Sequence, residues 1–183
     1  TGVQTCALPI FFHWKQEIPH ATYLVTLAVG EFSEIKDAWR GKPVSYFVPK
    51  GREEDARRAF GKTPKMMEFF STQIGVPYAY PKYAQVAALD FIFGGMENTS
   101  ATTQTALTLH DERAHLDFSS DPLVAHELAH QWFGDLLTCR DWSHAWLNES
   151  FATYFEALFT EHDKGGDEFA VELRQNAEIY FEE

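Results

Sequence analysis

The sequence predicts an α+β protein, because its strand-forming segments come first and its long helical segments come last. Short apolar runs bounded by Gly or Pro lie between residues 23 and 109, whereas helical spacing of apolar residues dominates after residue 121. Strands and helices that are segregated along a chain favour an α+β architecture over alternating βαβ units. With 45% hydrophobic and 15% aromatic residues, the 183-residue chain can bury a sizeable core.

The strands are predicted from short apolar runs that end at turn residues. Four segments are expected to be strands: 23–29, 44–48, 83–89 and 105–109. The charged stretch 30–42 is expected to be a connector at a domain boundary, and the polar stretch 110–120 is expected to be a loop.

The helices are predicted from the spacing of apolar side chains. Two short helices or one kinked helix are expected over 53–74, because Gly61 and Pro64 interrupt the pattern. Asp121 is the expected N-cap of the next helix, with Pro122 at its first position. Three later segments are expected to be helical: 121–137, 145–161 and 168–183.

The charge balance excludes several classes of partner. Fifteen Lys and Arg against 27 Asp and Glu give a net charge of −12, which argues against nucleic acid or an anionic membrane surface as a partner. No run of 18 apolar residues is present, so no membrane segment is expected. Cys6 and Cys139 do not form a CxxC pair, and they are expected to be buried thiols.

A metal-binding pattern lies in the helix that begins at Asp121. His126-Glu127-Leu128-Ala129-His130 places two imidazoles about 40° apart on one helix face, one turn apart along the axis. Two imidazoles in this arrangement can bind one zinc ion, with bonds of about 2.0–2.1 Å. Glu127 lies about 100° around the helix from the first imidazole, so its carboxylate borders the site without needing to be a ligand.

Glu149 is the expected third ligand, and it lies downstream of His130. The interval between the two is long enough for a turn and an antiparallel partner helix, whose aromatic residues are expected to bury much of it. One zinc ion would then have His126, His130 and Glu149 as ligands and water at the fourth position. Zinc lowers the pKa of bound water and polarises a carbonyl, and Glu127 can accept the water proton. Asn148 is a candidate for orienting the ligand beside it.

A glycine-rich segment is the expected substrate contact. Gly94-Gly95-Met96-Glu97-Asn98 follows the third predicted strand. The two glycines allow a ligand to approach the backbone closely, and the Glu97 carboxylate can bind a cation such as a free α-ammonium group.

In combination, these motifs resemble the zinc aminopeptidases of the aminopeptidase N family, which are gluzincins. The resemblance spans residues 12–183 and includes three flanking stretches: Tyr80-Pro81-Lys82-Tyr83, Gln131-Trp132-Phe133-Gly134-Asp135 and Trp146-Leu147-Asn148-Glu149. It implies a thermolysin-like catalytic domain, in which a mixed sheet is followed by zinc-binding helices. It further implies peptide substrates with a free N-terminal amine, bound by Glu97 beside Gly94, Gly95, Met96 and Asn98. Zinc would bind His126, His130 and Glu149, with Glu127 as general base.

The resemblance also implies how the chain is organised. Residues 1–32 would be the end of an N-terminal β domain, with 1–10 suspected to be non-native, and 33–183 the first part of the catalytic domain. The family has Gly where this chain has Ser150. The catalytic Tyr of the family lies further downstream than Glu183, so the isolated chain is expected to be catalytically incomplete.

Three alternatives remain open at this point. A zinc endopeptidase would share the metal site but cleave substrates without a free amine. A domain that binds zinc or peptide without turnover would share the ligands. A di-iron carboxylate protein would use Glu112-x-x-His115 together with Glu127-x-x-His130, but it needs both motifs on bundle helices, which the predicted strands oppose.

Overall fold

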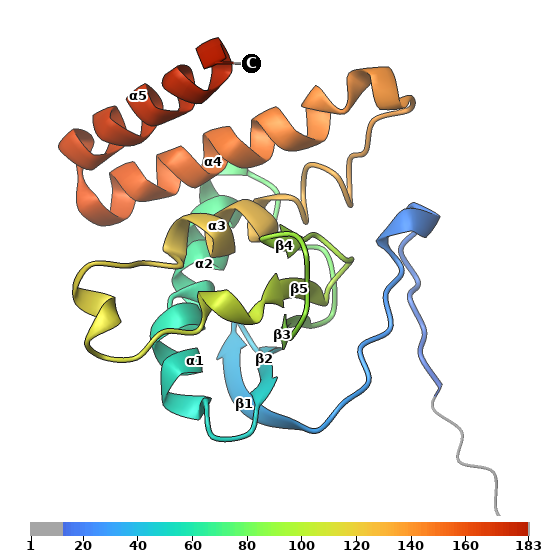
Figure 1. The fold of residues 1–183 in the computed structure, drawn as a ribbon. Coiled ribbons are helices and arrows are strands. Elements are labelled where there is room, and N and C mark those ends of the chain that lie inside the picture. The colour runs from blue at the N-terminus through green and yellow to red at the C-terminus, as the bar shows by residue number, and fades with distance from the viewer. Residues whose placement is uncertain (1–12, 183) are drawn as a thin grey trace, which may run out of the picture.

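A computed structural model describes residues 13–182 and confirms the α+β class. Its centre is a five-stranded mixed sheet in the order β1-β2-β3-β5-β4 (Figure 1). The strands are β1 (Phe32–Trp39), β2 (Lys42–Pro49), β3 (Tyr83–Ala88), β4 (Gly95–Met96) and β5 (Thr102–Thr105). The expectations for residues 1–10 and for Cys6 lie outside the described residues.

The sheet combines two hydrogen-bonding patterns. β1 and β2 form an antiparallel hairpin whose two turn residues, Arg40 and Gly41, have φ of 46° and 78°, as a type I′ turn requires. β3 pairs in parallel with both β2 and β5, and the short β4 pairs antiparallel with β5. β4 is therefore an edge strand, with no strand of residues 13–182 paired on the side away from β5.

Within residues 13–182, five α-helices complete the fold, with four 3₁₀ turns between elements. The helices are α1 (Glu53–Phe60), α2 (Thr63–Ile74), α3 (Asp121–Ala129), α4 (Trp146–Lys164) and α5 (Gly166–Glu182). The 3₁₀ turns are Thr22–Leu24, Ala106–Thr108, Ala114–Leu116 and Trp142–His144. α3 packs against α2 and α4, and α5 lies on the far side of α4 (Figure 1). No helix among the described residues is long and apolar enough to cross a membrane.

One aromatic cluster fixes α3 and α4 relative to the rest of the core. The fully buried Phe70 of α2 contacts Trp132, Phe155 and Phe159, with ring centroids 6.0, 6.1 and 6.2 Å away. Phe133 stacks on Phe155 at 5.2 Å. Because Trp132 and Phe133 follow α3 directly, these contacts set the position of α4 against the end of α3.

Two of the predictions at the start of the chain were wrong. The 23–29 segment is a 3₁₀ turn over Thr22–Leu24 followed by extended chain, and its alternating Val25, Leu27 and Val29 are exposed, with no strand paired to them among residues 13–182. The predicted connector 30–42 contains β1 instead. Its charged residues lie on an edge strand, and Ile35 and Trp39 supply the buried face.

The other differences arise from buried polar residues and from a turn. The strand predicted over 105–109 lies earlier in the chain, as β5, and a 3₁₀ turn follows it. The prediction misplaced this strand because its buried residues are polar: Thr102, Thr103 and Gln104. α3 ends at Ala129 rather than 137, and Gly134 has φ of 131° in the turn that follows. Asp121 is the first helical residue rather than the N-cap. The predictions for β2, β3, α1 with α2, α4 and α5 were confirmed to within a few residues.

We predict that Lys62→Met lowers the free energy of unfolding by about 2 kcal/mol, because it leaves a largely buried carboxylate unpaired. Lys62 Nζ lies 2.7 Å from Asp121 Oδ2 and 2.8 Å from Asp163 Oδ2, and both aspartate side chains are only 9% exposed. Urea unfolding followed by circular dichroism measures the change. Lys50→Met, which removes an exposed ion pair with Glu31, is the control and should cost less than about 0.5 kcal/mol. Equal costs for the two variants would contradict the prediction.

Candidate metal centre

Three donor atoms from α3 and α4 converge on one point. His126 Nε2 and His130 Nε2 are 3.1 Å apart, and Glu149 Oε2 lies 3.5 Å from the first and 3.4 Å from the second. A tetrahedron with metal–ligand bonds of about 2.0–2.1 Å has edges of about 3.3 Å. The three atoms therefore form a triangle of the size that one small divalent cation requires. His126 lies in the last turn of α3, His130 is the C-cap residue directly after it, and Glu149 lies in the first turn of α4.

The outer nitrogens of both imidazoles have acceptors that fix the tautomers. His130 Nδ1 lies 2.9 Å from the Phe133 carbonyl, and His126 Nδ1 lies 3.0 Å from Glu156 Oε2. A carbonyl oxygen only accepts, so His130 Nδ1 carries the proton and its Nε2 presents a lone pair. Two such lone pairs facing each other at 3.1 Å repel unless a cation or a proton lies between them. This donor set therefore fits a bound metal ion.

Glu156 was missed by the sequence reasoning. It lies two helical turns after Glu149, and therefore on the same face of α4, which is the signal that would have found it. Its carboxylate also affects the charge of the site. Burial lowers the pKa of His126, but hydrogen bonds to Glu149 and Glu156 outweigh it and raise this pKa to about 10. The same imidazoles hold the pKa of Glu149 well below its usual range. The carboxylates thus favour a positive charge on His126, and the imidazoles favour a negative charge on Glu149.

Glu127 points its carboxylate into the site without being one of the three converging donors. It is 5% exposed, and within residues 13–182 its Oε2 has no hydrogen-bond partner. Burial, opposed by His130 and His126, raises its pKa to about 7. A Cβ on Gly95 would lie 2.2 Å from Glu127 Oε1, so the glycine lets this carboxylate lie against the backbone of β4. The result is a carboxyl group that exchanges its proton near neutral pH beside the candidate metal donors.

The predicted substrate segment enters the same site along β4. Gly95 and Met96 pair with Gln104 and Thr103 of β5, which brings Glu97 to the end of the strand. A carboxylate oxygen of Glu97, one of Glu127 and a ring nitrogen of His130 lie within 4.8 Å of one another. The structure therefore groups the segment with the metal donors, although it lies far upstream of them in the sequence.

The members of this segment differ in what they can offer a ligand. Asn98 is buried, and both polar groups of its side chain are used inside the fold: Nδ2 donates to Leu24 O at 3.2 Å, and Oδ1 accepts from Thr103 Oγ1 at 2.7 Å. Gly94 O accepts from Thr105 N at 2.8 Å. Met96 remains half-buried at the edge of the sheet.

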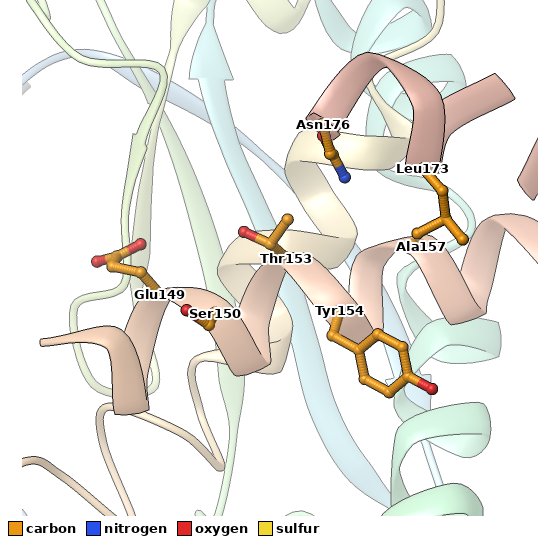
Figure 2. A pocket seen from close by; sticks show the side chains of 7 residues that line it. All are labelled: Glu149, Ser150, Thr153, Tyr154, Ala157, Leu173 and Asn176. Atoms are coloured by element: carbon orange, nitrogen blue, oxygen red, sulfur yellow. The ribbon is translucent and has the colours of Figure 1, made fainter. Parts of the chain in front are cut away.

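A pocket of about 290 Å³ opens beside Glu149, between α4 and α5 (Figure 2). Its lining residues are Glu149, Ser150, Thr153, Tyr154 and Ala157 on α4, with Leu173 and Asn176 on α5. The expectation that aromatic residues bury much of α4 does not hold around Glu149. Its side chain is 60% exposed, and Trp146 and Tyr154 are also exposed. The carboxylate therefore borders open space that a ligand can enter.

The di-iron alternative finds no support in the geometry. His115 Nδ1 pairs with His110 Nε2 at 2.8 Å in the segment before α3, and Glu112 is exposed on the same segment. The metal-ligand groups found among the described residues contain neither Glu112 nor His115. A di-iron site of this kind also needs a helical bundle, whereas residues 13–182 are built around a five-stranded sheet.

Comparison with known proteins gives one consistent result. The "Peptidase family M1 domain" matches residues 58–181. The chain is similar to "Probable aminopeptidase 2" of Sulfurisphaera tokodaii, 42% identical over 144 residues, which are 76% of this chain and 18% of the relative. It is also similar to "Aminopeptidase M1" of Arabidopsis thaliana, 40% identical over 154 residues, which are 80% of this chain and 17% of the relative.

A third relative is "Leucyl aminopeptidase" of Saccharolobus solfataricus, 38% identical over 148 residues, which are 79% of this chain and 19% of the relative. The chain thus spans about a fifth of the length of the curated relatives that it matches. The matched region contains both histidines, Glu97, Glu127 and Glu149. The chain belongs to peptidase family M1.

Proposed function

We propose that this chain forms the metal and amine-binding part of a zinc aminopeptidase, which removes N-terminal amino acids from peptides. The observation that carries the proposal is the triangle of His126 Nε2, His130 Nε2 and Glu149 Oε2, with edges of 3.1, 3.5 and 3.4 Å. Imidazole and carboxylate ligands in a His₂Glu set are typical of catalytic zinc, and three protein ligands leave a fourth position open. The names of the relatives support the same activity.

The surrounding residues have distinct roles in this proposal. Zinc bound by the three ligands would lower the pKa of a water molecule and polarise the carbonyl of the scissile bond. Glu127 accepts the proton of that water and returns it to the leaving amine, which suits a carboxyl group with a pKa of about 7. Glu156 and the Phe133 carbonyl keep the two imidazoles in the tautomer that binds a metal.

The position of Glu97 supports an aminopeptidase rather than an endopeptidase. In an N-terminal residue, the α-nitrogen and the carbonyl carbon are about 2.5 Å apart, because two bonds join them. A carboxylate that binds the ammonium group must therefore lie within a few ångström of the catalytic groups. Glu97 meets this requirement, since one of its oxygens is within 4.8 Å of Glu127 and of His130. A peptide chain continuing past Glu97 would bring no charge to pair with this carboxylate.

We predict that Glu127→Gln in the full-length protein that carries this sequence retains zinc and loses about 10²–10⁴-fold in kcat. The amide keeps the shape of the side chain but cannot accept a proton. Zinc content by atomic absorption and hydrolysis of aminoacyl p-nitroanilides measure the two properties. Glu161→Gln, an exposed change on α4, is the control. Unchanged kcat in the Glu127 variant would remove this residue from its proposed role.

We predict that Glu156→Ala weakens zinc binding about 10- to 100-fold, because His126 Nδ1 loses its acceptor. Competition with a chromogenic chelator measures the affinity. The matched control is Glu161→Ala, which removes an exposed carboxylate from the same helix and should leave the affinity unchanged. Equal affinities for the Glu156 variant and the unmodified protein would contradict this prediction.

We predict that Glu97→Gln raises KM for free-amine substrates about 10- to 100-fold, because a charged hydrogen bond to the ammonium group is lost. Zinc content should not change, since Glu97 is not one of the three ligands. Rates on an aminoacyl p-nitroanilide and on its N-acetylated form provide the measurement. If the unmodified protein cleaves both forms equally fast, the aminopeptidase proposal fails and an endopeptidase is indicated.

A further inference from the structure

The 3₁₀ turn Thr22–Leu24 lies far along the chain from the metal centre, yet it contacts the amine-binding segment. This turn is outside residues 58–181, which match the family domain. Leu24 is 2% exposed, and its carbonyl accepts from Asn98 Nδ2 at 3.2 Å. Tyr23 packs edge-on against Trp142, with ring centroids 5.0 Å apart. The turn is therefore held in a defined place beside the end of β4 and the segment before α4.

The hydroxyl of Tyr23 joins two buried side chains of the site. Asn148 Nδ2 lies 3.2 Å from this oxygen, and the oxygen lies 3.4 Å from Glu97 Oε1. Asn148 Oδ1 accepts from Cys139 N at 3.1 Å, which fixes the orientation of the amide and makes Nδ2 the group that faces Tyr23. The hydroxyl therefore accepts from Asn148, and its own proton is available to donate to Glu97.

The side chain of Glu97 needs such a donor, because the hydrogen bonds that Gln131 makes here hold only the backbone. Gln131 Nε2 donates to Glu97 O at 3.1 Å, and Gln131 Oε1 accepts from Ser100 N at 2.8 Å. These bonds fix the main chain but leave the side-chain torsions free. The carboxylate also lies close to the carboxyl groups of Glu127 and Asp135, each of which repels it when ionised. A hydroxyl donor on one oxygen selects one orientation against this repulsion.

We infer that Tyr23 is a positioning residue for substrate binding: its hydroxyl, oriented by Asn148, holds the Glu97 carboxylate where it receives the ammonium group of the peptide. This inference rests on the proposed function, because it assigns the amine to Glu97. Burial, followed by the nearby Glu97, raises the pKa of Tyr23 to about 12, so the hydroxyl keeps its proton at physiological pH and remains a donor. The amine site is then assembled from two segments, the 3₁₀ turn and the end of β4.

Tyr23→Phe in the full-length protein that carries this sequence tests the inference. The variant keeps the ring against Trp142 and removes only the hydroxyl. KM for an aminoacyl p-nitroanilide should rise about tenfold, while kcat changes less than about twofold and the zinc content is unchanged. Tyr46→Phe is the matched control, because Tyr46 donates to Asp37 in the β1–β2 hairpin and should leave KM unchanged.

Repeating the Tyr23→Phe substitution in a Glu97→Gln variant distinguishes positioning of Glu97 from a general structural effect. In a Glu97→Gln protein, Tyr23→Phe should raise KM less than about twofold, because the group that it orients has lost its charge. The inference is overturned if Tyr23→Phe leaves KM unchanged, if it lowers zinc content, or if it raises KM equally in both backgrounds. Failure of the proposed function is distinguishable, since Glu97→Gln alone would then leave KM unchanged.

Discussion

The packing of α4 against the end of α3 is the contact on which the candidate site depends. It is made by rings: Phe133 stacks on Phe151 and Phe155, with centroids 4.7 and 5.2 Å apart, and Phe155 also contacts Phe70. These contacts bring Glu149 to the two imidazoles of α3, and the same helix supplies Glu156 on the same face. A displacement of α4 by a single turn would move both carboxylates by about 5.4 Å and separate Glu149 from the two imidazoles.

Apolar packing has to hold this arrangement against unfavourable electrostatics. Several carboxyl groups are gathered around two imidazoles, and burial raises the pKa of Glu127 to about 7 and that of Asp135 to about 9. Within residues 13–182, neither oxygen of Asp135 has a hydrogen-bond partner. Anionic groups crowded in a buried region are destabilising unless a cation or protons offset them. A bound divalent ion would relieve part of this cost, so metal binding and stability are expected to be coupled.

Local patterns were enough to predict the helices and the converging donors, whereas contacts between distant segments were not. His126 and His130 are related by one helical turn, and Glu149 by the span of a helix–turn–helix, so sequence spacing carries this information. β1 was missed because its charged residues resemble a connector, and β5 was misplaced because its buried residues are polar. Tyr23 contacts Glu97 across 74 positions. No local pattern encodes such a contact.

The two helices that carry the candidate metal donors are connected to the Glu97 carboxylate, the proposed amine site, through residues adjacent to those donors. Gln131 follows His130 and holds the backbone of Glu97. Asn148 precedes Glu149 and reaches the Glu97 side chain through the hydroxyl of Tyr23. Because the α-nitrogen and the scissile carbonyl of a substrate are separated by only two bonds, an error of about 1 Å between the two subsites is costly. Two short paths from the ligands to one carboxylate keep that separation fixed, and in the proposed enzyme they select the first peptide bond.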